Sequence, residues 1–214
     1  GIPAFPNSIS NGVSGMLSEE FKYFAKYESS CNYDQGFSSS DDYHALGYYQ
    51  FDNRYDLQKF LKYCYQSDNN KYACFEAYLS CSKASLRNNK GLEKAWHTAY
   101  SNDPKDFANK QDQFEYDNYY IPIENALKSL GIDLSSRRDC MKGLVCGMAN
   151  LFGNSGAKRL IKNSGVTNDL GDKEFVTKLC DYLVSYCPKH YAYGKSYANR
   201  YKNEKNDCLR YISN

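Results

Sequence analysis

The sequence predicts an α+β fold that is predominantly α-helical and contains one small β-hairpin. From about residue 56 onward, apolar residues recur at the three- and four-residue intervals of helices with one buried face. Before that stretch, the aromatic segment ALGYYQFD at 45–52 is typical of a short strand or hairpin. The chain has 214 residues, of which 42% are hydrophobic, and this is enough to bury a sizeable core.

The N-terminal part divides into an arm and the start of a domain. Residues 1–15 hold Pro, Gly, Ser and Asn, and we expect a linker or extended arm there. We expect 16–214 to form a single domain, whose C-terminal third is a candidate helical extension. Ser18 has the properties of an N-cap, with two glutamates in the turn that follows it. The first helix is therefore predicted over 18–28, which places Glu28 at its C-terminal end.

A polar loop is expected over 31–43, and the hairpin at 45–52 follows it. The rest of the chain is punctuated by glycines and prolines, including Gly153 and Pro188, where we expect helices to end. The helices predicted between these breaks are 56–66, 71–85, 91–101, 104–113, 120–130, 137–151, 155–163, 172–186 and 194–212.

The overall charge argues against some classes of partner. The formal net charge is +2, and no run of Lys and Arg is dense enough to neutralise several neighbouring phosphates, so we expect no nucleic-acid partner. No segment approaches the roughly 20 apolar residues of a membrane span. We expect a monomer.

Nine cysteines are many for a cytosolic protein and predict an oxidising compartment with disulfides. The odd number leaves at least one thiol unpaired or intermolecular, and the pairing cannot be read from the spacing. With only three histidines and no CxxC spacing, we expect no structural zinc site.

The segment from Glu28 to Tyr55, ESSCNYDQGFSSSDDYHALGYYQFDNRY, combines one glutamate with four aspartates and frames them with tyrosines. Cleavage of a glycosidic bond needs a carboxylic acid to protonate the leaving oxygen and a carboxylate to activate water or stabilise the sugar cation. A carboxyl at the end of a helix rich in Phe and Tyr is partly desolvated, which favours its protonated form. Carboxylates in a polar loop stay ionised, so the segment offers both halves of this chemistry.

The spacing resembles that of the goose-type lysozymes, which share a superfamily with the soluble lytic transglycosylases. That family has Glu-Ser at a helix end, an Asp thirteen residues later, and a second Asp after eleven more within a Gly-x-x-Gln-x-Asp run. This chain keeps the register without a gap, with Glu28-Ser29, Asp41 and the run GYYQFD that ends at Asp52. Arg54 matches a basic position of the family.

The resemblance implies a lysozyme-like fold with a cleft beside the hairpin, and a muramidase that cuts the β-1,4 bond between N-acetylmuramic acid and N-acetylglucosamine. Glu28 would be the general acid, and Asp41 and Asp52 would position the water for inversion. Transglycosylases lack that aspartate pair, which favours hydrolysis. Candidate substrate-binding residues are Ser29, Asp42, His44, Tyr48, Tyr49, Gln50 and Tyr100.

These candidates rest on different arguments. Tyr48, Gln50 and Asp52 would share one face of a strand and Tyr49 the other. Tyr48 and Tyr49 replace Leu-Met of the family, which would reshape the sugar subsites. Tyr100 is carried over from an Ala-Tyr-Asn signature, although this chain has an extra Ser there. The resemblance covers about 28 residues closely and thins out afterwards.

The run DDYHALGYYQF also resembles chitosanase-like enzymes, and similar domains occur as muramidases in phage tail and secretion-system proteins. Glu28 keeps its role in that alternative, and either Asp41 or Asp42 would be the base. Three functions therefore stay open: a muramidase, a glycosidase or transglycosylase of related chemistry, and a non-catalytic wall-binding module.

The muramidase interpretation implies bacterial peptidoglycan as the partner, whereas the chitosanase-like alternative implies chitosan or chitin. Neither reaction needs a metal or organic cofactor, because two carboxylates and a water suffice. We expect the protein to be secreted or phage-associated. The biological roles that use such a domain are phage lysin, tail lysozyme, autolysin and antibacterial protein.

Overall fold

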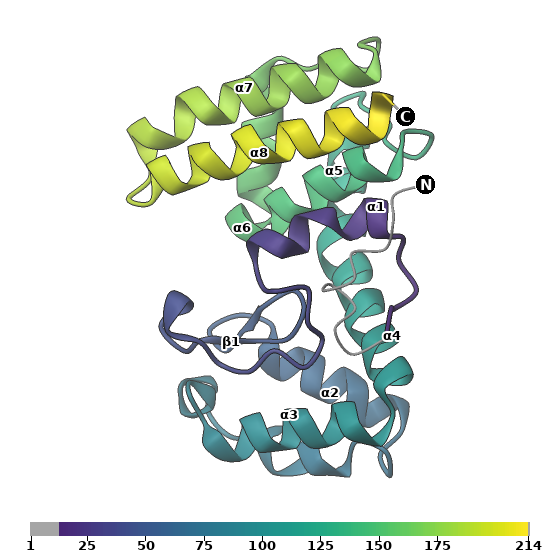
Figure 1. Ribbon diagram of the computed structural model, residues 1–214, viewed down its shortest axis with the longest axis vertical. Helices are drawn as coiled ribbons and strands as arrows, with labels where there is room; N and C mark the ends of the chain where they lie inside the picture. The colour runs from purple at the N-terminus through teal and green to yellow at the C-terminus, as the bar shows by residue number, and fades with distance from the viewer. Residues whose placement is uncertain (1–12, 214) are drawn as a thin grey trace. The chain divides into compact units, whose positions relative to one another are not determined.

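The structure is a computed structural model that describes residues 13–213, and it is predominantly helical with one small antiparallel sheet (Figure 1). This confirms the predicted fold class. The chain divides into two compact units. The first holds the described residues up to Leu17 together with Glu28–Glu115, and the second holds Ser18–Tyr27 together with the described chain from Tyr116 onward. Most of the predicted N-terminal arm, residues 1–12, lies outside the described residues.

The sheet of the first unit is the predicted hairpin at 45–52. Strand β1 (Ala45–Leu46) pairs with β2 (Phe51–Asp52) in an antiparallel register that sets Ala45 opposite Asp52. The four residues between the strands form a turn, in which Gly47 has a φ of 86° and Gln50 a φ of 59°. The hairpin is confirmed, but its strands are shorter than the segment that we predicted.

The first unit is otherwise built from helices. The long ones are α2 (Leu57–Ser67), α3 (Lys90–Asn102) and α4 (Pro104–Glu115), and they confirm the helices predicted at 56–66, 91–101 and 104–113. Short 3-10 segments fill the loops: η2 (Ser39–Asp41), η3 (Ala73–Tyr78) and η4 (Lys83–Leu86).

The prediction of one continuous helix over 71–85 is wrong, because η3 and η4 are separate. The side chain of Ser82 accepts a hydrogen bond from the backbone N–H of Ser85 and starts a new turn there. The amide of Gln58 donates to the carbonyls of Tyr78 and Cys81, which satisfies backbone groups that a continuous helix would have paired internally.

Aromatic rings form the core of the first unit. Trp96 is fully buried and lies 4.8 Å from Phe107, and Phe60 lies 4.7 Å from Phe51, measured between ring centroids. The indole N–H of Trp96 donates to the carbonyl of Tyr33 at 2.9 Å. This bond ties the loop after Glu28 to α3, so the aromatic core supports the loop as well as the hairpin.

The second unit is helical. It contains α1 (Glu19–Lys22), η1 (Tyr23–Tyr27), the π-helical turn η5 (Tyr116–Tyr120), α5 (Ile121–Lys128), α6 (Asp139–Ser164), α7 (Asp172–His190) and α8 (Gly194–Ser213). The last two helices lie side by side (Figure 1). Among residues 13–213, no helix combines the length and the apolar character that crossing a bilayer requires.

Two sequence signals of this unit act as predicted, and a third does not. Ser18 caps α1 by accepting the N–H of Phe21, but only four residues are α-helical before the chain tightens into η1. Gly153 interrupts α6 with φ 76° and ψ 164°, at the break predicted between 151 and 155. Pro188 does not end α7, which continues to His190.

Carboxylates of α8 hold η1 in place within this unit. The hydroxyl of Tyr23 donates to Glu204 at 2.6 Å, and the hydroxyl of Tyr27 donates to Asp207 at 2.6 Å. Arg200 pairs with Glu204 at 2.6 Å, with both side chains buried. Burial raises the pKa of both tyrosines, and the neighbouring carboxylates raise it further, so the hydroxyls stay protonated and act as donors.

All nine cysteines lie among the described residues and none of them forms a disulfide, which does not agree with the disulfides expected from their number. Most are buried, and burial raises the pKa of Cys64 and Cys180 well above its usual value. Cys140 and Cys208 each lie beside the other's backbone carbonyl, with sulfur–oxygen distances of 3.9 and 3.6 Å. These thiols therefore pack as small apolar groups.

Candidate functional site

Glu28 follows η1 directly in the chain and is half-buried, as expected for a residue at a helix end. The next residue, Ser29, donates its hydroxyl to the carbonyl of Tyr48 at 2.7 Å and accepts the N–H of Cys31 at 3.1 Å. Ser29 therefore fastens the segment that carries Glu28 to the hairpin turn. Its polar atoms are used in this link, so we assign it a positioning role rather than substrate contact.

Asp41 is the last residue of η2 and the most unusual carboxylate of the first unit. Both of its carboxylate oxygens are buried, and neither accepts a hydrogen bond of normal geometry from the described part of the chain. Burial raises the pKa of Asp41 and the charge of Asp52 raises it further, against the opposing pull of the backbone N–H groups of His44 and Tyr43. Such a carboxylate has free lone pairs and a raised proton affinity, which suits a general base.

Asp52 ends β2, and Arg54 holds its carboxylate on both oxygens. The guanidinium Nη2 lies 2.8 Å from Oδ2 and Nε lies 3.1 Å from Oδ1, while the backbone N–H of Arg54 also donates to Oδ1 at 2.8 Å. This bidentate geometry fixes the orientation of the carboxylate. Asp52 thus acts as a turn residue and also places a fixed negative charge close enough to perturb Asp41.

Asp42, in contrast to Asp41, is exposed to solvent. Its carboxylate pairs with Nη2 of Arg87 at 2.6 Å. The ring of His44 uses Nδ1 in a 2.7 Å hydrogen bond with Oδ1 of Asn53, and its Nε2 lies 3.9 Å from Asp42. Between the two adjacent aspartates that the sequence left open as the base, burial therefore favours Asp41.

Tyr48 and Tyr49 lie in the core, so the prediction that their rings contact sugar is wrong for this structure. Their exposed fractions are 2% and 0%. Tyr48 stacks on Tyr33 at 4.3 Å, and the hydroxyl of Tyr49 donates to the buried carboxylate of Asp112 at 2.8 Å. The alternating-face argument fails because both residues belong to a turn and not to a strand.

Two further candidates also have structural contacts. Gln50, which shares that turn, donates its side-chain amide to the carbonyl of Gly47 at 2.9 Å and so braces the hairpin. Tyr100 lies on α3 with only 9% of its surface exposed, which leaves little area for a sugar contact.

Backbone strain concentrates around these residues. Among the described residues, the non-glycine positions with positive φ are Cys31, Asp42, Tyr43, Gln50 and Asn88. Four of them fall between 31 and 50, and the N–H of Asn88 donates to the carbonyl of Tyr43 at 3.0 Å. Such conformations cost on the order of 1–3 kcal/mol each and cluster at functional sites, because the surrounding structure must be built to hold them.

Tyr43 and Tyr55 are exposed aromatic residues that the sequence did not single out. Their exposed fractions are 37% and 65%, and they flank the two ends of the segment that carries the hairpin. The guanidinium of Arg54 lies over the ring of Tyr55 at 5.7 Å. The signal that could have found them is their position, because each lies within three residues of Asp41 or Asp52.

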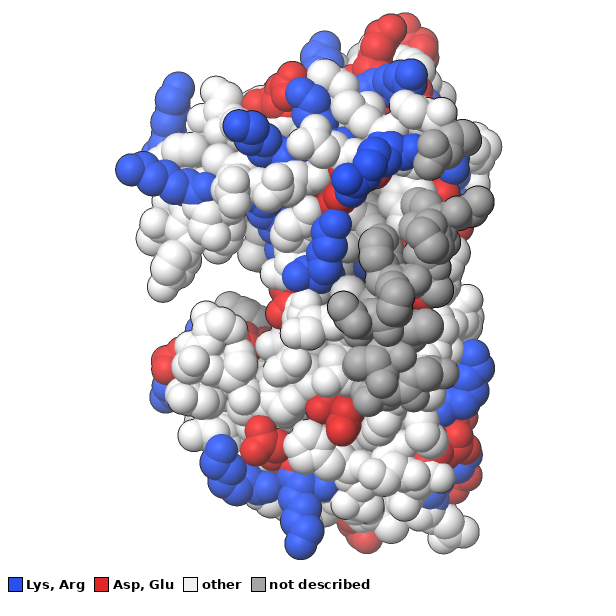
Figure 2. Space-filling model, in the orientation of Figure 1, with Lys and Arg blue, Asp and Glu red and all other residues white. Residues whose placement is uncertain are grey.

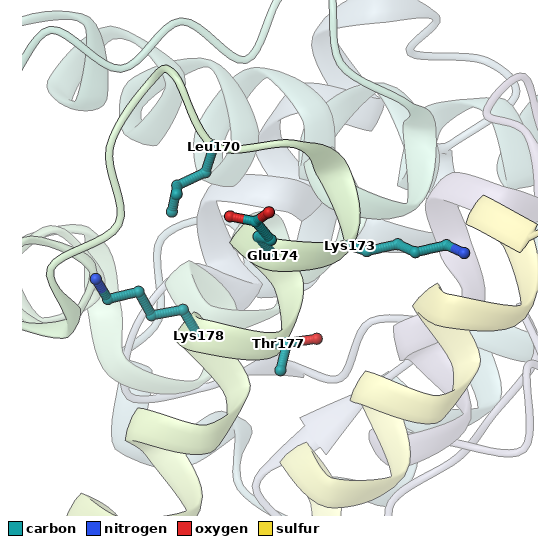
Figure 3. A pocket seen from close by; sticks show the side chains of 5 residues that line it. All are labelled: Leu170, Lys173, Glu174, Thr177 and Lys178. Carbon is teal, nitrogen blue, oxygen red and sulfur yellow. The ribbon is translucent and has the colours of Figure 1, made fainter.

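Two other features of the molecule bear on the site. No three His, Cys, Asp or Glu residues of the described chain gather in a way that could hold a metal ion. A hollow of about 380 Å³ lies in the second unit at the start of α7, where Lys173 and Lys178 extend in opposite directions around Glu174 (Figure 3). It contains none of the candidate residues and no buried polar group, so we do not regard it as the site.

Both units carry basic and acidic side chains on the face shown in Figure 2.

Comparison with known proteins gives one family. The C-terminal region of the VgrG3-like type VI secretion system spike protein matches residues 22–207 of this chain, a range that includes Glu28, Asp41 and Asp52. No curated protein matches. The match agrees with the resemblance to domains of secretion-system proteins, while muramidase activity and membership of the goose-type family stay predictions. Because the match extends over most of the 214 residues, the chain belongs to the family of VgrG3-like C-terminal domains of type VI secretion system spike proteins.

Proposed function

We propose that this domain is a peptidoglycan hydrolase that cleaves the β-1,4 bond between N-acetylmuramic acid and N-acetylglucosamine. The observation that carries the proposal is the carboxylate of Asp41, whose buried oxygens accept no hydrogen bond of normal geometry from the described chain and feel the charge of Asp52. The backbone N–H groups of His44 and Tyr43 favour its charged form without making hydrogen bonds of normal geometry, so its oxygens can still accept a proton from water or a ligand. The strained loop that holds Asp41 supports the same conclusion.

The proposed reaction assigns one step to each carboxyl group. Glu28 donates its proton to the glycosidic oxygen as the bond from that oxygen to C1 of the muramic acid breaks. Water attacks C1 from the opposite face of the sugar, and its proton passes to Asp41. Asp52, fixed by Arg54, helps to orient the water and stabilises positive charge on the sugar ring. The product has a new reducing end with inverted configuration.

Membership of a secretion-system spike family supports a cell-wall target. A domain carried on such a spike would act on the wall that the spike reaches. We therefore propose that the spike carries this domain to the cell wall, where the domain cleaves the glycan strands.

The direct test is the release of soluble sugar from purified peptidoglycan. We expect Glu28→Gln and Asp41→Asn each to lower the rate at least about a hundredfold, the usual contribution of a positioned acid or base. Glu76→Gln, which changes an exposed glutamate of η3 in the same unit, is the matched control and should retain the wild-type rate. Retention of activity by Glu28→Gln would overturn the assignment of the acid.

The same assay separates the remaining functions. Cleavage of chitosan oligomers in preference to peptidoglycan would make the domain a chitosanase-like glycosidase. Pelleting with cell walls without soluble fragments would make it a binding module.

A further inference from the structure

Tyr43 combines two properties that are costly together. Its side chain is 37% exposed, and its backbone is in the left-handed region with a φ of 62°. Large side chains avoid this region, which glycine and asparagine adopt at less cost. The fold therefore maintains a strained aromatic residue at the surface, outside the buried core.

The strained loop is braced on both sides. The N–H of Tyr43 donates to the carbonyl of Ser38 at 2.8 Å, and its own carbonyl accepts the N–H of Asn88 at 3.0 Å. Arg87 donates from Nε to the carbonyl of Asp42 at 3.0 Å and pairs with the Asp42 carboxylate at 2.6 Å. These contacts fix the backbone from which the Tyr43 side chain extends before any ligand arrives.

Tyr43 differs from the other large exposed apolar residues of the described chain. Met16, Tyr55 and Tyr193 are exposed by 54%, 65% and 73%, and none has a positive φ. The ring of Tyr55 already has the guanidinium of Arg54 over it. Tyr43 is also two residues from Asp41, whose carboxylate oxygens are buried without a normal hydrogen bond from the described residues.

We infer that Tyr43 is a sugar-binding residue that stacks on the apolar face of a pyranose ring of the bound glycan strand. The inference rests on the proposed function, since Asp41 sets where the reacting sugar lies. A flat apolar ring with a hydroxyl at its edge suits a sugar, which offers an apolar ring face and hydroxyls around its rim. The braced backbone fixes where this side chain leaves the loop, two residues from the carboxylate that acts at the bond to be cut.

Binding is tested with the hexamer of N-acetylglucosamine and calorimetry, in a Glu28→Gln background that does not turn the ligand over. We expect Tyr43→Ala to weaken binding about tenfold. Tyr43→Phe should bind within about twofold of its parent, because it keeps the ring. Tyr193→Ala, which removes an exposed tyrosine of the second unit, is the control and should leave the affinity unchanged.

Tyr43→Gly separates ligand binding from a structural role. Glycine adopts a positive φ without strain, so the Tm of this variant should equal or exceed that of its parent while its affinity falls as in Tyr43→Ala. A structural tyrosine would lower both. In the active protein, Tyr43→Gly should raise KM and leave kcat close to wild type.

The outcomes distinguish this inference from the proposed function. Unchanged affinity in Tyr43→Ala, or no hexamer binding by the parent, overturns the sugar-stacking role even if peptidoglycan is cleaved. Failure of the wild type to release products from peptidoglycan overturns the proposed hydrolysis, while the binding series still decides whether Tyr43 holds sugar.

Discussion

Asp41 and Asp42 are neighbours in the chain, but their environments differ. Asp41 is held in a half-buried position where burial and the charge of Asp52 raise its pKa, whereas Asp42 is exposed and neutralised by Arg87. Composition cannot separate two adjacent aspartates. The left-handed backbone at Asp42, with a φ of 59°, separates them by turning the second carboxylate outward.

Arg54 controls the electrostatic coupling between Asp41 and Asp52. Replacing it by Gln removes the positive charge that offsets Asp52, so the field on Asp41 grows and the pKa of Asp41 rises further. A base must be ionised, and a higher pKa means that ionisation needs a higher pH. We therefore expect the acidic limb of the profile of kcat/KM against pH to move up by about half to one unit in Arg54→Gln.

The pH profile of Lys62→Gln provides the comparison, since that exposed lysine of α2 lies in the same unit. It should match the wild type. An acidic limb that stays in place or moves to lower pH in Arg54→Gln would show that Asp41 is not the ionising group.

Gly47 is required by the hairpin turn. A Cβ added there would lie 2.5 Å from Cζ2 of Trp96 and 2.7 Å from Oε1 of Gln111, and the φ of 86° adds strain. We expect Gly47→Ala to lower the free energy of unfolding by about 2–4 kcal/mol, measured by urea denaturation. Gly131→Ala is the matched control, because Gly131 has a similar φ of 78° but open space around its Cβ. An equal loss in both variants would mean that backbone strain alone, without the steric clash, accounts for the effect.

At the scale of elements, periodicity predicted most of the helices, and Ser18 and Gly153 acted as the expected cap and break. Periodicity could not predict features that depend on contacts between segments far apart in the sequence. The region 71–85 became two 3-10 segments because Gln58 on α2 satisfies its carbonyls. The ring of Tyr49 is buried because it meets Asp112 on α4, 63 residues away.

The candidate site was predictable to a similar degree. The register of Glu28, Asp41 and Asp52 can be read from the sequence, and the structure sets them on a helix end, a 3-10 turn and a strand end. The strained loop and the exposure of Tyr43 could not be predicted, because the hydrogen bonds that impose the conformation come from residues 38 and 88.

Glu20 links α1 to the start of α6. Its carboxylate accepts the N–H of Cys140 at 3.0 Å and pairs with Nη2 of Arg138 at 2.9 Å. Burial alone would raise the pKa of Glu20, but the hydrogen bonds from Arg138 and Cys140 outweigh it and lower the pKa from the usual 4.5. The ionised carboxylate therefore stabilises the folded state above pH 4.5, and that contribution is lost as the pH falls through the lowered pKa.

We expect Glu20→Gln to cost about 1 kcal/mol at pH 7, as for other groups that cap a helix N-terminus, and to differ little from wild type near pH 3. Thermal unfolding across this pH range measures both effects. Asp181→Asn, which removes an exposed ion pair with Lys205, should change Tm only slightly at either pH. A Glu20→Gln deficit that persists undiminished at pH 3 would contradict the ionic origin of the effect.

At the scale of the whole molecule, no sequence pattern predicted that the segment Ser18–Tyr27 belongs to a compact unit with the C-terminal half of the chain. Tyr23 and Tyr27 bond to Glu204 and Asp207 across about 180 residues of sequence. Local patterns carry no information on such long-range pairs. Within the second unit, the carboxylates of α8 therefore hold η1 in place.

Hydrolysis of glycan strands by this domain is proposed to depend on Glu28 as the acid. The most direct measurement is mass spectrometry of the soluble products from purified peptidoglycan, with wild type beside Glu28→Gln. We predict fragments with reducing N-acetylmuramic acid ends from the wild type and none from the variant. Anhydro-muramic ends would contradict the roles of Asp41 and Asp52 as water-positioning groups, and equal product formation by Glu28→Gln would contradict the claim as a whole.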